Sequence, residues 1–274
     1  MVQFWKMHGL GNDFIVVDNR DERIREAEAS SLAIKLCDRN LGVGADGLLL
    51  LSNSSVADAK MRTFNADGSE AEMCGNGIRC FAKYCYETGI VKKTDFMVET
   101  QAGLKQVWLT IRGDVVEAVR VDMGTAEWER SKIPMQGEGK ALNVDLRVDE
   151  ENYKVTCLSM GNPHCVIFVE NVDETPVEYV GPIIENHEAF PKKTNVEFVQ
   201  ILKRDAIKVR VWERGCGETL ACGTGACASA VAAHMMGFVN PKVKVHLLGG
   251  ILEVSVANHV YMAGPAVKVF EGKI

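Results

Sequence analysis

The chain carries one pattern twice, and this internal duplication constrains its fold more than any other feature. The motif CGNG at 74–77 returns as CGTG at 222–225, 148 residues later. Other pairs keep this spacing or one of 150: Arg62 with Arg210, Glu70 with Glu218, Gly89 with Gly237, and Gly11-Asn12 with Gly161-Asn162. The sequence therefore predicts a duplicated unit of roughly 120 to 150 residues, and two pseudo-symmetric domains with a site between them.

Short segments that alternate apolar and polar residues predict a mainly antiparallel sheet in each half. They lie at 60–64, 95–100, 105–111, 116–122, 207–212 and 252–256.

Helices are few and are expected in pairs. One pair is predicted near 27–39 and 176–189, and the other runs from the two motif cysteines to about 88 and 236. Small apolar residues occupy every side of 226–233, which is typical of a helix buried all round. We therefore expect an α+β fold of two pseudo-symmetric domains, each a mainly antiparallel, barrel-like sheet around a central helix.

The domain boundary is expected near 120–124, where the last strand of the first half ends. We assign 1–121 together with 265–274 to an N-terminal domain, and 122–264 to a C-terminal domain. The final strand, 265–274, is expected to cross back to the first domain. Two connections would limit domain motion to a hinge.

Charge and composition narrow the function classes. The net charge is -6 and the pI is near 5.6, without a basic cluster, so we expect no nucleic-acid partner. No apolar run approaches the roughly 18 residues of a membrane span, and no signal sequence is evident, so we expect a cytoplasmic protein without a membrane partner. Nine cysteines, an odd number, favour a reducing compartment over a disulfide framework. A homodimer is compatible with these features.

Cys74 and Cys222 are the candidate catalytic residues. Inversion of an α-carbon needs a base on one face and an acid on the other, and a pair of thiols can exchange these roles without metal or cofactor. A helix N-terminus is expected to lower the pKa of each thiol. The glycines that follow would leave backbone N–H groups uncovered for a substrate carboxylate.

The remaining cysteines and several polar residues admit simpler interpretations. Six cysteines are expected to be buried small hydrophobes: Cys37, Cys80, Cys85, Cys157, Cys165 and Cys227. Cys216 lies in a Gly-Cys-Gly turn and is expected to serve the loop. Glu213-Arg214 forms either a surface ion pair or a site for an ammonium and a carboxylate. His164 either tunes a thiolate or satisfies a loop.

The whole chain resembles diaminopimelate epimerase. The motifs that carry the resemblance are MHGLGNDF at 7–14, FNADGSE at 64–70, CGNGIRC at 74–80, MGNPH at 160–164, ERGCGET at 213–219 and ACGTGAC at 221–227. The resemblance implies interconversion of LL- and meso-diaminopimelate, in lysine and peptidoglycan precursor synthesis. It also implies a pyridoxal-independent, metal-free mechanism that uses two bases.

The resemblance also assigns roles to residues. Cys74 and Cys222 would be the paired acid and base, and His164 and Glu213 would tune the thiols. The residues implied to bind substrate are Asn12, Asn65, Gly75, Asn76, Asn162, Asn195, Glu213, Arg214, Gly223 and Thr224. One position departs from the family, because some members carry Gln where this chain has Gly47, the pseudo-symmetric partner of Asn195.

Three alternatives remain at this stage. A proline or hydroxyproline racemase also uses two cysteines, but such enzymes tend to carry His where Asn76 stands. A zinc-binding or thiol-redox protein would use Cys216, Cys222 and Cys227, whose spacings do not match common zinc knuckles. A non-enzymatic duplicated binding module would not need either motif thiol. If the two thiols flank one carbon, oxidation is expected to join Cys74 to Cys222.

Overall fold

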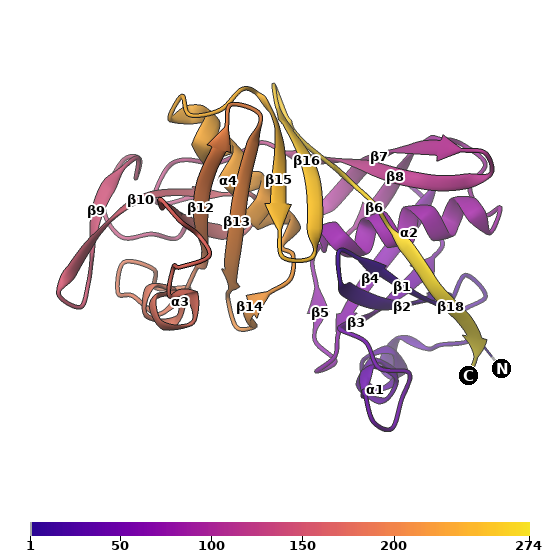
Figure 1. Ribbon diagram of the computed structural model, residues 1–274. Helices are drawn as coiled ribbons and strands as arrows, with labels where there is room; N and C mark the ends of the chain where they lie inside the picture. The colour runs from indigo at the N-terminus through magenta and orange to yellow at the C-terminus, as the bar shows by residue number, and fades with distance from the viewer. Residues whose placement is uncertain (1) are drawn as a thin grey trace. The chain divides into compact units, whose positions relative to one another are not determined.

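The computed structural model describes residues 2–274, which divide into two compact units (Figure 1). The first unit comprises the chain up to Asp122 together with Ala263–Ile274, and the second comprises Met123–Met262. The boundary lies one residue later than expected from the sequence, and the return to the first unit lies two residues earlier.

The elements of the first unit follow the expected order of strands and two helices. They are β1 (Gln3–Gly9), β2 (Asn12–Asp18), α1 (Glu26–Cys37), β3 (Gly47–Ser52), β4 (Ala59–Asn65), β5 (Glu70–Ala71), α2 (Gly75–Glu87), β6 (Asp95–Thr100), β7 (Gly103–Arg112), β8 (Val115–Gly124) and β18 (Val267–Lys273).

The second unit repeats most of this order. Its elements are β9 (Val144–Val148), β10 (Glu151–Ser159), β11 (Pro163–Phe168), α3 (Val177–Glu185), β12 (Asn195–Lys203), β13 (Ala206–Glu213), β14 (Gly217–Thr219), α4 (Gly223–Met235), β15 (Lys242–Leu247), β16 (Gly250–Val256) and β17 (Val260–Gly264).

The strand pairing repeats from one unit to the other. Most pairs are antiparallel, as the alternation predicted, but β2–β3 and β4–β6 are parallel, and so are β11–β12 and β13–β15. A helix lies between the members of each parallel pair along the chain, as a parallel crossover requires. The register also repeats, since Phe14 lies opposite Gly47 and His164 lies opposite Asn195.

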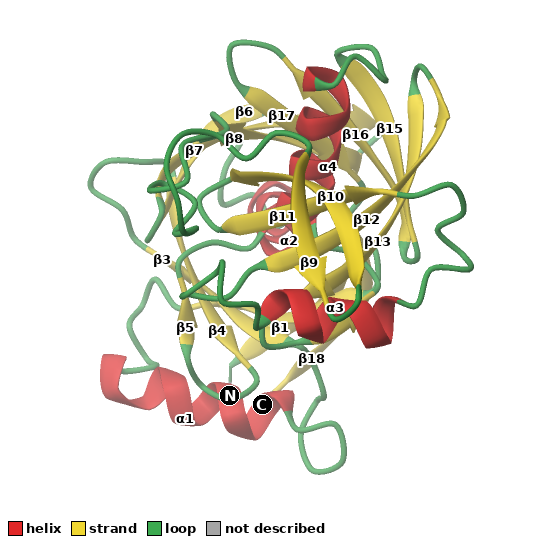
Figure 2. Ribbon diagram, turned by 90° about the vertical axis from the view of Figure 1, so that its left-hand side faces the viewer, coloured by secondary structure: helices red, strands yellow, loops and turns green. Residues whose placement is uncertain are grey.

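A buried helix forms the centre of each unit, which confirms the predicted fold class. Helix α2 is buried from Gly75 to Cys85 and packs on β1, β2, β3, β4 and β7. Figure 2 shows this helix nearly along its axis. Helix α4 packs on β10, β11, β12, β13, β15 and β16. The duplicated motif therefore opens a core helix in both units.

The path of the C-terminal strand and the end of helix α3 can be compared with the predictions. Strand β18 pairs antiparallel with β1, from Gln3 opposite Lys273, so the C-terminal strand does return to the first unit. Helix α3 ends at Glu185 rather than near 189. The amides of Asn186, backbone and side chain, both donate to the carbonyl of Pro182, which closes the last turn. Within residues 2–274, no helix is long and apolar enough to cross a membrane.

Candidate active site

The two motif cysteines occupy the N-cap positions of their helices. Cys74 precedes α2 with an extended backbone, φ −133° and ψ 118°, and its Sγ accepts a hydrogen bond from the backbone N–H of Gly77 at 3.3 Å. Cys222 precedes α4 in the same way, with φ −110° and ψ 118°, and accepts from Gly225 at 3.3 Å. An N-cap side chain typically satisfies one amide of the first helical turn. The predicted position of each thiol at a helix start is therefore confirmed.

In the first unit a directed line of hydrogen bonds runs past Cys74. Arg79 is completely buried and donates to the side-chain oxygen of Asn76 at 3.0 Å. Asn76 then donates from Nδ2 to Oδ1 of Asn12 at 3.1 Å, and this same oxygen lies 3.8 Å from Sγ of Cys74. Because a guanidinium can only donate, the direction of this line is fixed at the Arg79 end. Cys74 therefore faces a hydrogen-bond acceptor.

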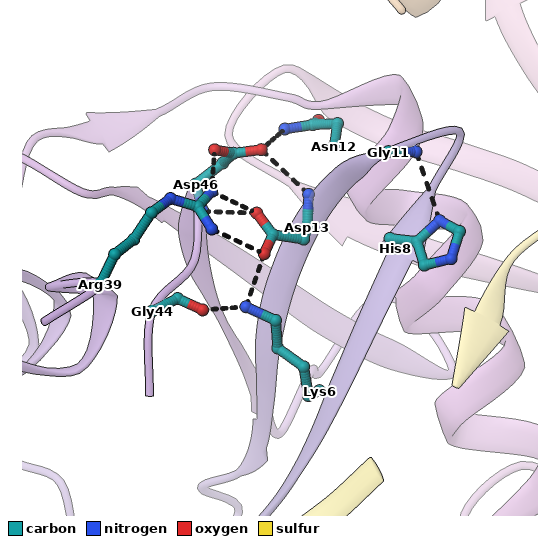
Figure 3. A network of polar contacts seen from close by, with 8 residues as sticks. All are labelled: Lys6, His8, Gly11, Asn12, Asp13, Arg39, Gly44 and Asp46. Carbon is teal, nitrogen blue, oxygen red and sulfur yellow. Dashed lines mark hydrogen bonds and ion pairs between the residues drawn. The ribbon is translucent and has the colours of Figure 1, made fainter. Parts of the chain in front are cut away.

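Asp46 fixes the other end of this line (Figure 3). Asn12 donates from Nδ2 to Oδ2 of Asp46 at 2.8 Å, and an ionised carboxylate can only accept. Asp46 is held in turn by Arg39, whose Nη2 lies 2.8 Å from Oδ1, and by the backbone N–H of Asp13 at 3.0 Å. The turn before Asn12 uses left-handed conformations at Leu10 and Gly11, with φ of 57° and 89°, which lets β1 and β2 pair closely.

A second ion-pair cluster supports the same strand ends. Asp13 is bonded by Arg39 at 2.8 Å and by Nζ of the buried Lys6 at 2.6 Å, and Lys6 also donates to the carbonyl of Gly44. Burial raises the pKa of Asp13, but the hydrogen bonds from Arg39 and Lys6 outweigh it, and the pKa is lowered to about 2. Asp13 is therefore ionised at neutral pH.

In the second unit the corresponding asparagine is turned the other way. Asn162 donates from Nδ2 to Oγ1 of Thr224 at 3.2 Å, and Oγ1 lies 3.5 Å from Sγ of Cys222. The oxygen of Asn162 faces Nε2 of His164 at 2.9 Å. Nδ1 of His164 contacts Oε1 of Glu197 at 2.6 Å, and both side chains are fully buried. Cys222 therefore lies beside a hydroxyl that can donate to it, whereas Cys74 lies beside an acceptor.

The prediction that a helix N-terminus lowers the pKa of each motif thiol is wrong for Cys222. Burial raises the pKa of this thiol well above its ordinary value, and the charges of Glu213 and Glu197 raise it further. The hydrogen bonds from Thr224 and Gly225 oppose this rise without overcoming it. A helix N-terminus is one local contribution, and here the desolvation of a side chain only 5% exposed exceeds it.

The other expected substrate residues lie at the ends of β4, β12 and β13. Asn65 is exposed and donates from Nδ2 to Oγ of Ser69 at 2.9 Å. Asn195 is buried, donates to the carbonyl of Pro163 at 2.8 Å and accepts from the backbone N–H of Arg214 at 2.9 Å. Its amide thus ties β12 to the turn after β13.

Glu213 and Arg214 each have a hydrogen-bond partner in the second unit. Oε1 of Glu213 accepts from the hydroxyl of Thr219 at 2.5 Å, while the exposed Arg214 donates to the carbonyl of Lys192 at 3.2 Å. Glu213 is the last residue of β13 and Arg214 is the first residue after it, in the turn before β14.

The remaining cysteines are located as expected. Six are buried: Cys37, Cys80, Cys85, Cys157, Cys165 and Cys227. Burial raises the pKa of Cys80 to about 12, which keeps it a thiol. Cys216 is exposed in the turn between β13 and β14. Among the described residues no group of three His, Cys, Asp or Glu side chains could hold a metal ion.

Sequence reasoning missed three residues that position the candidate site: Asp46, Arg79 and Glu197. Arg79 carried a signal, because a cation within an otherwise buried helix needs partners. Asp46, directly before β3, and Glu197, within β12, carried none, since their partners are 34 and 33 residues away in the chain.

The fold itself is shared with several solved structures. The probable proline racemase from Agrobacterium radiobacter K84 aligns with a TM-score of 0.74 at 18% identity, covering 100% of this chain and 93% of that one. A PhzF-family protein from Bacillus anthracis aligns with a TM-score of 0.72 at 18% identity, covering 100% of this chain and 98% of that one. The chain thus has the duplicated, two-unit fold of this structural class, with a cysteine at the start of each core helix.

Comparison with known sequences defines the family of this chain more narrowly than the shared fold does. The family described as Diaminopimelate epimerase matches residues 4–129 and 156–269. Diaminopimelate epimerase of Moorella thermoacetica is 53% identical, covering 99% of this chain and 98% of the relative. That of Methanococcus maripaludis strain S2 is 48% identical, covering 100% and 99%. The chain belongs to the diaminopimelate epimerase family.

Proposed function

We propose that this protein interconverts LL-2,6-diaminopimelate and meso-diaminopimelate by proton transfer at one α-carbon, without a metal or an organic cofactor. The observation that carries the proposal is the family match over both halves of the chain, together with relatives of about half identical sequence over their full length. Both match segments contain one N-cap cysteine, Cys74 in the first and Cys222 in the second.

In this mechanism Cys74 and Cys222 are the acid and base. One thiolate removes the α-proton from one face of the carbon, and the other thiol delivers its proton to the opposite face. Each turnover therefore leaves the two sulfurs with their protonation states interchanged. The reverse reaction uses them in the opposite roles. Burial of Cys222 favours its thiol form in the protein without substrate. This form suits Cys222 to act as the acid in the turnover in which Cys74 acts as the base.

The first turns of α2 and α4 would hold the carboxylate of the reacting centre. Backbone N–H groups at Gly75, Asn76, Gly223 and Thr224 lie at the positive ends of these helices, where an anion is stabilised. As the α-proton leaves, negative charge spreads onto this carboxylate, so the same groups stabilise the transition state.

The distal amino acid group of the substrate is assigned to the polar strand ends. Asn12, Asn65, Asn162 and Asn195 offer amides, Glu213 offers a carboxylate for an ammonium, and Arg214 offers a guanidinium for a carboxylate. Selection for an L centre at this end would explain why only one of the two α-carbons is inverted. His164 and Glu213 would tune the thiols, as the contacts around Cys222 suggest.

Deuterium incorporation from solvent tests the proposal. The purified full chain, with no added cofactor, is incubated in D2O with either diaminopimelate isomer, and the α-position is followed by mass spectrometry. We expect deuterium in the product from both directions and none in proline under the same conditions. Exchange into proline at a comparable rate would favour a proline racemase, and no exchange into diaminopimelate would refute the assignment.

The proposal includes a location and a set of partners. A precursor of lysine and peptidoglycan is made in the cytoplasm, so we assign the protein to that compartment, with a small-molecule substrate and neither nucleic acid nor membrane as partner. Analytical ultracentrifugation of the purified chain decides whether it forms a homodimer.

A further inference from the structure

Glu197 is a buried carboxyl group with one unsatisfied oxygen. It lies on β12 and is completely buried, and its Oε2 has no hydrogen-bond partner among the described residues. Its Oε1 lies 2.6 Å from Nδ1 of His164. A Cβ built on Gly225 would stand 2.8 Å from the same oxygen. Only a glycine thus lets the first turn of α4 approach this carboxyl so closely, and Gly225 is also the residue whose N–H contacts Cys222.

The first unit offers an internal comparison at the same positions. Leu49 lies 148 residues before Glu197, and a Cβ on Gly77 would stand 3.3 Å from its Cδ2. Phe14 lies 150 residues before His164, and the two hold the same register position. The second unit thus has a titratable pair, Glu197 and His164, where the first unit has two apolar side chains.

The contacts of Glu197 and His164 indicate where their protons are. Asn162 uses Nδ2 to donate to Thr224, so its oxygen faces Nε2 of His164, which must carry a proton to make this hydrogen bond. The short contact between Nδ1 and Glu197 holds a second proton, whichever of the two atoms it is bonded to. A neutral imidazole alone holds one proton, which can sit on either nitrogen. Glu197 supplies the acid that keeps Nε2 protonated.

We propose that Glu197 is a positioning residue for Cys222, acting through His164, Asn162 and Thr224. Protonated Nε2 fixes the Asn162 amide with its NH2 toward Thr224. Oγ1 of Thr224 then accepts that hydrogen bond, so its own proton points to the sulfur at 3.5 Å. If Nε2 lost its proton, the amide would turn, Thr224 would donate to Asn162, and the sulfur would lose a donor. The proposal rests on the proposed function in one respect only, which is that catalysis uses the thiolate of Cys222.

The other titratable groups around this line are few. Glu213 acts on both Cys222 and Glu197 and raises the pKa of each, although burial is the larger cause for both. Cys165 lies near Glu197, but its hydrogen bond with Cys157, together with burial, raises its pKa and keeps it a thiol. The charge of Glu197 raises the pKa of the Cys222 thiol, whereas the donor line lowers it, so the two effects of Glu197 have opposite signs.

The protonation of His164 can be measured in the wild-type chain. With 15N-labelled histidine, two-bond 1H–15N correlation spectra distinguish the two ring nitrogens, and His164→Gln assigns the signal. We expect a proton on Nε2 of His164 from pH 6 to pH 8. A bare Nε2 within this range, with the proton on Nδ1 alone, would overturn the proposal without any variant of Glu197.

Two variants of Glu197 then test its effect on the thiol. The rate of Cys222 alkylation by iodoacetamide is followed against pH by peptide mass mapping, with Cys74 as a control within the same molecule. Glu197→Leu copies the side chain of the first unit and removes the acid. Glu197→Gln keeps a donor toward Nδ1, so it preserves the protonated Nε2.

We expect Glu197→Leu to slow the alkylation of Cys222 about tenfold near pH 8, the effect of one hydrogen bond to an anion, and to leave Cys74 unchanged. Glu197→Gln should react like the wild type. Faster alkylation in both variants would mean that Glu197 acts by its charge, and an unchanged rate in Glu197→Leu would mean that it acts only structurally. Either result overturns the proposal. Because no readout uses epimerisation, failure here is distinct from failure of the proposed function.

Discussion

Gly47 and Asn195 hold the same position in the two units, yet only Asn195 has a side chain that spans a strand end. Gly47 lies opposite Phe14 and Asn195 lies opposite His164 in parallel pairs of equal register. The amide of Asn195 binds the carbonyl of Pro163 and the N–H of Arg214. At Gly47 a Cβ would stand 2.7 Å from the carbonyl oxygen of Phe64, so the local backbone leaves no room for a side chain.

We therefore expect Gly47→Ala to lower the free energy of unfolding by about 1–3 kcal/mol, the usual effect of overpacking against backbone. Chemical denaturation measures this change. Ser52→Ala, at the other end of β3, is the control and should change stability by less than about 0.5 kcal/mol. Equal stability of Gly47→Ala and the wild type would show that β3 can move away from β4 without loss.

The motif thiols are each expected to be essential for turnover. A serine hydroxyl is far too weak an acid and base to replace a thiol at neutral pH, so Cys74→Ser and Cys222→Ser should each lose epimerisation while circular dichroism and thermal unfolding stay close to the wild type. The exposed Cys216→Ser is the matched control and should retain activity. Near-normal turnover in either motif variant would refute the acid and base assignment.

The sequence predicted the structure best at the two copies of the motif, because the residues that define each copy lie close together in the chain. The motif at 222–225 lies 148 residues after that at 74–77, and α4 begins and ends 148 residues after α2. Here the glycines, the N-cap cysteine and the apolar helix all act within a few residues, so the pattern alone defines them. The return of β18 to the first unit also followed from the sequence, because one strand remained after the second copy was complete.

The direction of the hydrogen bonds around each thiol could not be predicted in this way. Asn12 and Asn162 are equivalent in sequence, but Asp46 turns one amide and His164 turns the other. Asp46 reaches Asn12 through the pairing of β2 with β3, and His164, although only two residues from Asn162, is held by Glu197 from the paired strand β12. The rise in the pKa of Cys222 has the same origin, since burial and two carboxylates on other strands exceed the effect of the helix start.

The ion pairs of Asp13 predict a loss of stability in acid. The pKa of this carboxyl is about 2 in the folded protein against 3.8 in a model compound, so its stabilising effect is complete above about pH 4 and is lost as the pH falls through about 2. Asp13→Asn should lower the free energy of unfolding at pH 7, by an amount on the order of 2 kcal/mol, and should flatten its fall between pH 4 and 2. Urea denaturation at several pH values measures this, with the exposed Asp114→Asn as control. An unchanged acid dependence in Asp13→Asn would contradict the assignment.

Glu213 should act on the neighbouring thiol through its charge. After burial, its charge is the next largest cause of the raised pKa of Cys222, so Glu213→Gln is expected to lower that pKa. The thiolate then forms at lower pH, and the pH profile of Cys222 alkylation moves to lower values. Glu218→Gln, whose carboxylate is paired with Arg210 at 2.6 Å, is the comparison on the adjoining strand β14 and should leave the profile in place. A profile that moves to higher pH in Glu213→Gln would show that this side chain stabilises the thiolate instead.

Oxidation of the protein in the absence of substrate provides a further test of the two-thiol mechanism. If Cys74 and Cys222 act on opposite faces of one carbon, mild oxidation of the protein without substrate is expected to join the two sulfurs in a disulfide. We expect diamide-treated protein to lose activity, to yield one peptide that joins Cys74 to Cys222, and to recover with dithiothreitol. In Cys74→Ser the same treatment should leave Cys222 without this link, which separates the specific disulfide from general damage. Full activity after oxidation, with no such peptide in the map, would mean that the two thiols do not share one site.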